Sequence, residues 1–306
     1  MRKVVFVILA MFLCAGCSQK TNKDVVRSVY YWRTTFNIAP EEKEFLKEHN
    51  ISRMYLRLFD VVVNSDNEVM PNATIKFLSP LPDSIDFVPV VFITNDCMTR
   101  DVSDLPQKLY SRILQICETH DIPAPKEIQI DCDWTMKTRL TYFNMLKELH
   151  SLAKADGRRL TTTIRLHQLT QPIPPVDGGT LMVYNTGDVS DIKEQKPILD
   201  PAVVRKYAPR LRGYKLPLNS AYPIFSWDVL FRGGRYIGIM HGDDDLPTLK
   251  GDSIITRRPS LDDIMQAKDI VESNHDRISN EIIIYDLNKD NIKQLKHTDY
   301  EKIYSR

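Results

Sequence analysis

The chain has 306 residues, of which 42% are hydrophobic and 26% are charged, and its formal net charge is +1 at pH 7. This length suits one large α/β barrel or two smaller domains. A near-neutral chain offers no basic field for nucleic acid, so no nucleic-acid partner is expected.

The N-terminus has the pattern of a secretory signal peptide covering residues 1–16. Arg2 and Lys3 form the charged start, and Val4–Leu13 is an apolar run too short to cross a bilayer as a helix. Cleavage would remove both basic residues and turn the small net charge negative. No second apolar segment is long enough to span a membrane.

A lipid anchor is predicted directly after this segment. The run Cys14–Cys17 resembles a bacterial lipobox, which predicts acylation of Cys17; ordinary secretion with cleavage nearby is the alternative. Residues 17–27 would be the lipidated N-terminus and a polar tether. Ser18 after the modified cysteine suggests sorting to the outer membrane. We therefore expect a cell-envelope protein that contacts the membrane through Cys17.

The remaining chain, residues 28–306, alternates between strand-like and helix-like apolar segments. Eight strands are predicted, at Ser28–Phe36, Ile51–Val63, Phe87–Thr94, Glu127–Asp133, Arg159–His167, Thr180–Asn185, Tyr214–Leu218 and Glu281–Asp286. Helices are predicted at Pro40–His49, Leu105–His120, Arg139–Ala155 and Pro201–Leu211, with a short one from Asn291. This alternation is typical of βα units and predicts a single (β/α)8 TIM-like barrel domain.

Two regions depart from a regular barrel. Asn64–Asp86 has no convincing helical pattern, which leaves a distorted or incomplete barrel open. Asn219–Asn280 is a long insertion before the last strand. Within it, the turn Arg232–Arg235 contains two glycines and predicts a hairpin, and Leu261–Glu272 predicts a helix.

The end of the fourth strand carries the most informative residues. Alternation along the strand turns Asp131 and Asp133 to one face, whereas Ile130 and Cys132 take the other. In barrel enzymes the active site lies at the carboxyl ends of the strands. Two carboxylates there, followed directly by Trp134, are what a carbohydrate-cleaving enzyme needs, and they are also what a structural ion-pair network looks like.

The same alternation places three basic side chains inside the barrel mouth. Arg57 would face inward from the second strand, and Arg165 and His167 from the fifth, so all three are candidate substrate-binding residues. Because the fourth and fifth strands are neighbours, Asp131 and Arg165 could form a site or simply pair to offset each other's desolvation.

Two further acids end predicted strands. Asp286 ends the last strand and is a third catalytic candidate. Asp60 falls on the apolar face of the second strand unless a bulge reorients it, so it ranks below Asp286.

Aromatic side chains gather at the predicted strand ends and in the insertion. Flat apolar rings with a polar group suit sugar rings, which present C–H surfaces edged by hydroxyls. Packing under loops is the alternative for each one. The candidate substrate-binding aromatics are Trp32, Trp134, Tyr184, Tyr222 and Trp227.

The segment Gln129–Thr135 resembles the fourth-strand motif of the chitinase-like glycoside hydrolases. By position, Asp131 and Asp133 match the two aspartates of that motif, and Thr135 stands where its catalytic glutamate would be. Threonine cannot protonate a glycosidic oxygen at a useful rate. Either Asp133 takes that role in a shifted geometry, another carboxylate such as Asp286 supplies it, or the barrel has lost hydrolysis.

The secreted chain also resembles a group of bacterial TIM-barrel lipoproteins, a likeness that includes Tyr214–Leu218 and Ser220–Pro223. This likeness covers nearly the full length and implies no particular activity.

These observations lead to two functional hypotheses. In the first, an envelope lipoprotein hydrolyses glycosidic bonds in a polysaccharide or oligosaccharide. Asp133 would be the acid and Asp131 the anionic partner, while Tyr184 or Arg165 positions the sugar. In the second, a glycan-binding or assembly lipoprotein keeps the cleft without a working acid.

Neither a cofactor nor a metal site is expected from local motifs. The seven histidines show no His-Glu-x-x-His or comparable zinc spacing, and there is no phosphate loop or dinucleotide fingerprint. After Cys17 the chain keeps three cysteines, an odd number that argues against a disulfide framework. A bridge between Cys117 and Cys132 is one alternative, and two buried thiols are the favoured one.

Overall fold

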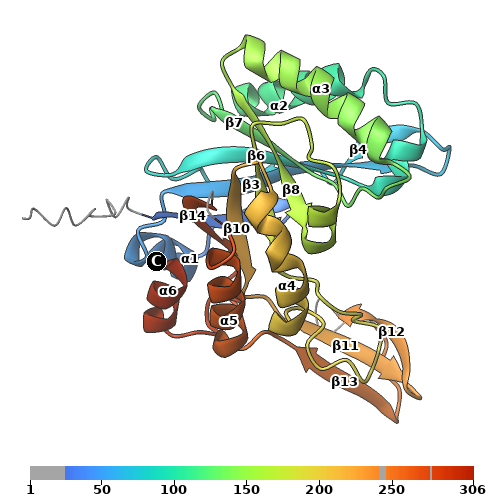
Figure 1. The fold of residues 1–306 in the computed structure, drawn as a ribbon, viewed down its shortest axis with the longest axis vertical. Coiled ribbons are helices and arrows are strands. Elements are labelled where there is room, and N and C mark those ends of the chain that lie inside the picture. Colours follow the sequence, from blue (N-terminus) through green and yellow to red (C-terminus); the bar gives the residue numbers. More distant parts are fainter. Residues whose placement is uncertain (1–24, 241–245, 276–277) are drawn as a thin grey trace, which may run out of the picture.

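A closed parallel barrel forms the body of the protein. The computed structural model describes residues 25–240, 246–275 and 278–306, so the predicted signal peptide, Cys17 and most of the predicted tether lie outside the described residues. The ring closes because its first strand, Val26–Tyr31, pairs with both its last strand, Ile278–Tyr285, and its second strand, Arg53–Val63. The prediction of a (β/α)8 TIM-like barrel is confirmed (Figure 1). In ring order the strands are β1 (Val26–Tyr31), β3 (Arg53–Val63), β6 (Asp86–Ile93), β7 (Glu127–Asp131), β8 (Arg159–Arg165), β9 (Gly178–Met182), β10 (Leu218–Pro223) and β14 (Ile278–Tyr285).

Helices cover the outside of this ring. Each turns an apolar stripe inward; in the second helix the stripe includes Leu109, Ile113 and Ile116. The predicted bounds of the third and fifth helices agree with the structure. The helices are α1 (Pro40–Glu48), α2 (Leu105–Thr119), α3 (Arg139–Ala155), α4 (Pro201–Tyr207), α5 (Leu261–Glu272) and α6 (His297–Tyr304), with 3-10 turns η1 (Asn95–Thr99), η2 (Leu166–Thr170) and η3 (Ala208–Gly213).

The connection between β3 and β6 contains strands where a regular barrel has a helix. β4 (Val69–Asn72) pairs antiparallel with the end of β3. β5 (Lys76–Phe77) pairs with β2 (Thr35–Phe36). The missing helical period in this segment therefore reflects a real distortion of the barrel.

Two predicted elements are wrong in position. The seventh strand is β10, which begins at Leu218 and not at Tyr214. Pro217 has no N–H to donate to a neighbouring strand, so the ladder begins after it. The polar side chain of Asn219, which follows, is tolerated inside the barrel because its amide donates a hydrogen bond to Glu281 at 2.8 Å. The last helix begins at His297, not at Asn291.

A polar network fills the N-terminal end of the barrel. The carboxylate of Glu281 accepts from Ser28 at 2.7 Å and from Tyr55 at 3.1 Å. Arg53 lies 3.1 Å from Glu281 and 3.9 Å from Glu127. Because these buried charges are paired and hydrogen-bonded, they offset each other's desolvation. The pocket described below opens at the opposite end.

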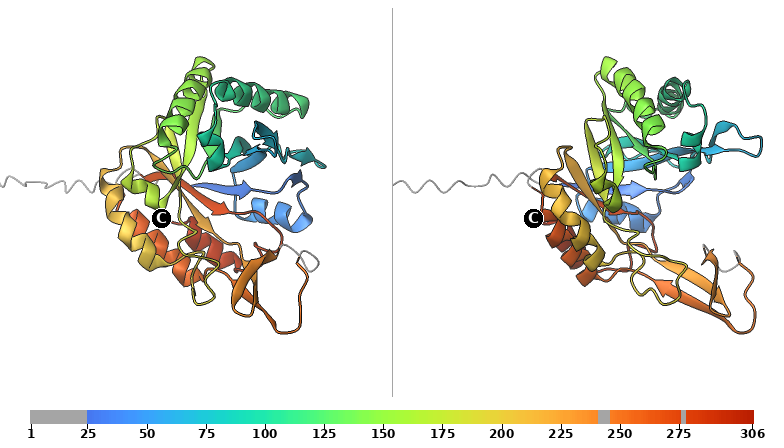
Figure 2. Two further views of the ribbon diagram at one scale, coloured as in Figure 1. Left: turned by 90° about the vertical axis from the view of Figure 1, so that its right-hand side faces the viewer. Right: turned by 45° about the vertical axis from the view of Figure 1, so that its right-hand side comes forward.

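The insertion before the last strand contains a small sheet that projects from the barrel. β11 (Trp227–Arg232) is its central strand, between β12 (Arg235–Met240) and β13 (Asp252–Arg257). Gly233 and Gly234 both adopt positive φ at the tip of the first hairpin, as predicted from the double glycine. Figures 1 and 2 show this sheet extending away from the ring, beside the carboxyl ends of the strands.

The close packing of β9 yields a stability prediction. A methyl group at Gly179 would lie 3.0 Å from the carbonyl oxygen of Thr162 and 3.1 Å from Ile164 and Leu218. Gly179→Ala should therefore destabilise the fold by about 1–3 kcal/mol through overpacking. Gly213→Ala is the matched control, because nothing lies within 4 Å of the added carbon. Chemical denaturation measures both, and equal midpoints would contradict the prediction.

Candidate active site

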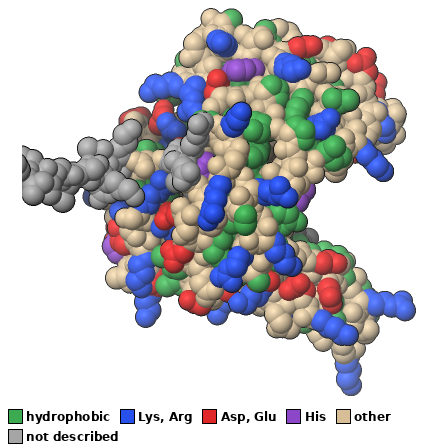
Figure 3. Space-filling model, viewed as in Figure 1, with side chains coloured by type: hydrophobic (Ala, Val, Ile, Leu, Met, Phe, Trp, Pro, Cys, Tyr) green, Lys and Arg blue, Asp and Glu red, His purple; other side chains and the backbone are tan. Residues whose placement is uncertain are grey.

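A cavity of about 730 Å³ opens at the carboxyl ends of the barrel strands. Its walls come from the barrel on one side and from the projecting sheet on the other, and Figure 3 shows the hollow between these two parts. The lining residues are Trp32, Arg57, Phe92, Asp131, Asp133, Arg165, Tyr184, Asn185, Phe225, Ser226, Trp227, Asp228, Met240, Ile254, Tyr285, Asp286, Asn288, Asp290 and Asn291.

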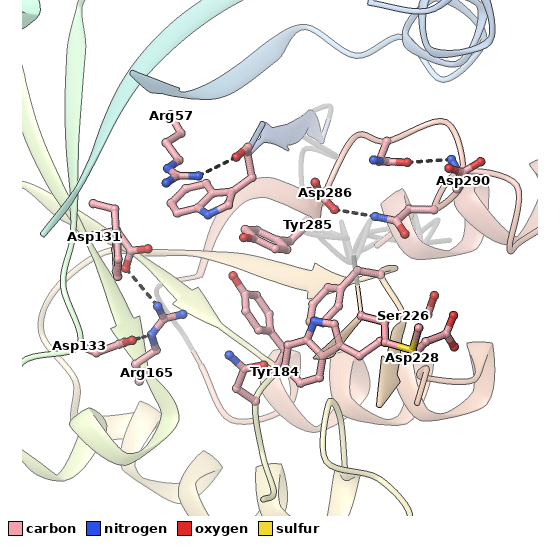
Figure 4. Close-up of a pocket in the computed structure, with 18 of the residues that line it drawn as sticks. Arg57, Asp131, Asp133, Arg165, Tyr184, Ser226, Asp228, Tyr285, Asp286 and Asp290 are labelled. Atoms are coloured by element: carbon pink, nitrogen blue, oxygen red, sulfur yellow. Dashed lines mark hydrogen bonds and ion pairs between the residues drawn. The ribbon is translucent and has the colours of Figure 1, made fainter. Parts of the chain in front are cut away.

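One side of the pocket is an arginine held between two aspartates (Figure 4). Arg165 lies 3.2 Å from Asp131 and also donates to Asp133. Asp131 ends β7, accepts from Thr163 at 2.5 Å, and has a side chain only 3% exposed, whereas that of Asp133 is 55% exposed. Burial raises the pKa of Asp131, and the charge of Arg165 opposes that rise.

Asp286 lies on another side of the pocket, directly after β14. Figure 4 shows it separated from Asp131 and Asp133, with aromatic rings between them. Its carboxylate accepts from the Asn291 amide at 2.7 Å. Loss of hydration raises the pKa of Asp286 to about 6, and the Asn291 hydrogen bond only partly opposes this. Such a carboxyl is partly protonated near neutral pH and can donate a proton.

A bulge in β3 brings Arg57 and Asp60 together. The pairing with β6 shifts register between Arg57 and Phe59. Arg57 Nε therefore donates to Asp60 at 2.6 Å, and Nη1 donates to the Trp32 carbonyl at 3.0 Å. Arg57 lines the pocket, as predicted, and its guanidinium lies 5.5 Å from the Trp32 ring centre. Asp60 supports Arg57 from behind and does not line the pocket.

Aromatic rings form the floor and one wall of the pocket. Tyr285 lies at their centre, with ring centres 5.6 Å from Trp32, 5.0 Å from Tyr184 and 5.7 Å from Phe225. Trp227, from the start of the projecting sheet, continues this surface and lies 5.1 Å from Phe225. Trp32, Tyr184 and Trp227 are thus brought together as the sequence analysis proposed.

Two predicted substrate-binding residues lie elsewhere, and a third, His167, lines only the neighbouring cavity. Trp134 is 1% exposed, and its ring packs against Phe143 at 5.2 Å, beneath helix α3. Tyr222 is fully buried in β10, whose alternation turns it outward from the barrel. For both residues, core packing replaces the predicted contact with substrate. His167 lines a neighbouring cavity and not the main pocket.

That neighbouring cavity extends the site. It measures about 280 Å³ and shares Asp133, Arg165 and Tyr184 with the main pocket. His167 and Tyr207 line its far part. The two cavities therefore form one elongated cleft along the barrel mouth.

Sequence reasoning missed several pocket residues that lie in loops or on the insertion. Phe225, Ser226 and Asp228 precede or begin β11, and Asn288 and Asp290 follow β14. Their positions after strand ends could have identified the second group, but nothing in the sequence showed that the projecting sheet folds over the mouth.

The predicted preference for unbridged cysteines agrees with the structure, in which Cys97, Cys117 and Cys132 are buried free thiols. Cys132 and Cys117 were the pair considered for a bridge. Burial raises the pKa of both thiols, so neither resembles an activated nucleophile.

The sequence matches no protein-family model and no curated protein. The structure is similar to that of the Bacillus cereus spore cortex-lytic enzyme SleL, with 13% identity, a TM-score of 0.58 and coverage of 92% of this chain and 74% of that chain. It is similar to a chitinase from Chromobacterium violaceum ATCC 12472, with 9% identity, a TM-score of 0.58 and coverage of 91% and 98%. A chitinase from Bacteroides thetaiotaomicron shares 13% identity, a TM-score of 0.52 and coverage of 91% and 93%.

These likenesses show that the chain has a glycoside-hydrolase-like barrel fold. At such low identity they establish the fold and not the activity. Thr135, at the position of the catalytic glutamate in the motif that Gln129–Thr135 resembles, is exposed and bonded to Thr138, and it does not line the pocket. Any proton donor must therefore be sought among other residues.

Proposed function

We propose that the protein is a glycoside hydrolase that cleaves a polysaccharide or oligosaccharide bound along the barrel mouth. The observation that carries this proposal is the elongated pocket, in which five carboxyl groups, among them those of Asp131, Asp133 and Asp286, share the lining with a surface of aromatic rings. Aromatic faces bind the C–H surfaces of sugars. A protonated carboxyl group and an ionised one can together cleave the glycosidic bond that joins two sugar units.

We assign the acid role to Asp286 in place of Asp133, which the sequence analysis favoured. Asp133 is 55% exposed and paired with Arg165, so it lacks the dry surroundings that keep a carboxyl protonated. Asp286 has such surroundings and a pKa of about 6. Its proton would pass to the glycosidic oxygen as the bond to the anomeric carbon breaks.

Asp131 is the anionic partner in this proposal. Its side chain is 3% exposed and held by Arg165 and Thr163. This arrangement suits stabilisation of the positive charge that develops on the sugar, and a water molecule would complete the reaction. Tyr184, against the Arg165 guanidinium at 5.9 Å, would position the reacting sugar.

A non-catalytic glycan-binding protein is the second candidate. The observation that favours it is the threonine at position 135, where the motif that this segment resembles has its acid. A barrel that has lost hydrolysis would keep the aromatic surface and the Arg165 network and would bind sugars without cleaving them.

We further propose that lipidation of Cys17 anchors the protein in the cell envelope, with its barrel held outside the membrane and the outer membrane as the expected location. Among the described residues, no helix is both long enough and apolar enough to cross a membrane. Radiolabelled palmitate incorporated into the wild type but not into Cys17→Ser would support this anchor, and equal labelling would contradict it.

The decisive test of activity uses the purified protein and a panel of oligosaccharides and polysaccharides, including N-acetylglucosamine polymers. Hydrolysis predicts new reducing ends that increase with time and enzyme concentration. Binding by calorimetry without new reducing ends would select the glycan-binding alternative. Neither binding nor cleavage across the panel would contradict both candidates.

Trp227→Ala should weaken binding of a responsive oligosaccharide by about tenfold, because loss of one stacked ring costs on the order of 1 kcal/mol or more. Tyr236→Ala is the matched control: it lies on the same projecting sheet, is 39% exposed and does not line the pocket. Titration calorimetry measures both variants. An equal effect of the two substitutions would remove the aromatic wall from the binding site.

A further inference from the structure

A cluster of potential metal ligands lies at the base of the barrel, away from the pocket. Glu48 and His49 lie at the C-terminal end of α1, and His297 begins α6, the two helices seen side by side in Figure 1. One possible ligand atom from each of the three residues lies within 4.8 Å of the others. Arg27, near the start of β1, donates to the carbonyl of His49 at 3.1 Å, which places the cluster beside the N-terminal end of the barrel.

The neighbours of His49 hold its ring in an orientation that suits metal binding. Its Nδ1 lies 2.8 Å from Glu301 Oε1, and Arg27 holds both oxygens of Glu301 at 2.8 and 2.9 Å. An ionised carboxylate only accepts hydrogen bonds, so Nδ1 carries the proton and Nε2 keeps its lone pair. Histidine ligands of metals are oriented by such a carboxylate on the other ring nitrogen.

Rotation of side chains would bring the three ligand atoms, now within 4.8 Å of one another, to a common metal. The ring centres of His49 and His297 are 4.5 Å apart. In a tetrahedral zinc site, bonds of about 2.0–2.1 Å place ligand atoms about 3.3 Å apart. His49 is 2% exposed and fixed by its neighbours, whereas Glu48 and His297 are exposed and can rotate toward it.

We infer that Glu48, His49 and His297 form a binding site for a divalent transition metal such as Zn²⁺. Two imidazole nitrogens and one carboxylate match the ligand preference of zinc and its neighbours, and not that of Ca²⁺ or Mg²⁺, which take oxygen ligands. Water would occupy the fourth position. The bound metal would join α1 to α6, two helices from opposite ends of the described chain.

Local motifs did not indicate this site because its ligands are far apart in sequence. The histidine spacings that identify zinc sites from sequence require both ligands within one helix or loop. Here the pairing depends on closure of the barrel, which brings the first and last helices together.

The test is a calorimetric titration of the purified full-length protein, prepared without a histidine tag, with ZnCl2. The wild type should bind one Zn²⁺ per chain, and His297→Ala should bind it at least tenfold more weakly. His120→Ala is the matched control, since it removes an exposed histidine outside the cluster. Glu48→Gln should also weaken binding, and CaCl2 should give no saturable binding.

Two results would overturn the inference: no saturable uptake of Zn²⁺ by the wild type, or equal affinity in His297→Ala and the wild type. Melting curves in EDTA provide the folding control. The side chains of Glu48 and His297 are exposed, so substituting either one should leave the melting temperature of the metal-free protein unchanged. The outcome is independent of any activity at the pocket.

Discussion

Asp286→Asn is expected to lower the turnover of a responsive glycan by at least about 100-fold, because a positioned general acid contributes on the order of 10²–10⁴ in rate. Substrate affinity should change little, since the asparagine keeps the shape of the side chain. Asp290→Asn is the matched control, because it changes an exposed pocket carboxylate in the same way. Unchanged reducing-end formation in Asp286→Asn would remove this residue from the mechanism.

The same substitution should raise stability at neutral pH. The folded-state pKa of about 6 exceeds the ordinary value of 3.8, so Asp286 stabilises the fold most below pH 4 and loses that contribution as the pH rises through 6. Removing its charge should therefore increase the free energy of unfolding by about 1–3 kcal/mol at pH 7–8 and by little at pH 4. Denaturation at both pH values measures this difference, and a loss of stability at pH 8 would contradict it.

Enzymatic activity should also depend on the protonation state of Asp286. If Asp286 must be protonated to act, kcat/KM of the wild type should fall as the pH rises above about 6. A profile that is flat from pH 5 to 8 would show that another group donates the proton.

Arg165→Met is expected to destabilise the protein by about 3–5 kcal/mol, the cost of leaving a buried charge without its partner. The charge left behind is that of Asp131, whose side chain is 3% exposed. Adding Asp131→Asn to the Arg165→Met chain should recover most of this loss, because the buried group is then neutral. Denaturant unfolding of the single and double variants measures the coupling between the two residues.

The sign of the pH effect follows from burial. Burial already raises the pKa of Asp131 against the opposing charge of Arg165, so loss of Arg165 should raise it further. The defect of Arg165→Met should thus be small in acid and grow as the pH approaches neutrality. Lys108→Met, which breaks the ion pair between the exposed side chains of Lys108 and Asp104, should have a small effect. Equal defects in Arg165→Met and Lys108→Met would contradict a special role for the buried pair.

Local sequence patterns predicted most of the elements and one half of the site. Apolar periodicity gave the bounds of α3 and α5, and the alternation along β7 and β8 placed Asp131 and Arg165 on the same inner face. These features depend on residues close together in the chain, whose spacing alone decides which way each side chain points.

The failures occurred where a side chain has two plausible environments. Trp134 and Tyr222 follow the same aromatic pattern as Trp32, yet they pack against helices. The predicted strand ended at Leu218 and left Tyr222 in the insertion, whereas β10 continues to Pro223 and therefore includes Tyr222.

The amino-acid sequence by itself determined the alternation of strands and helices and the inward face of the fourth and fifth barrel strands, because these follow from local periodicity. Tertiary structure alone decided that Asp286 is desolvated, that Phe225 and Tyr285 complete the aromatic wall, and that His49 meets His297. The physical reason is that desolvation and contact depend on which distant segments pack together. That packing is set only when the ring of strands closes.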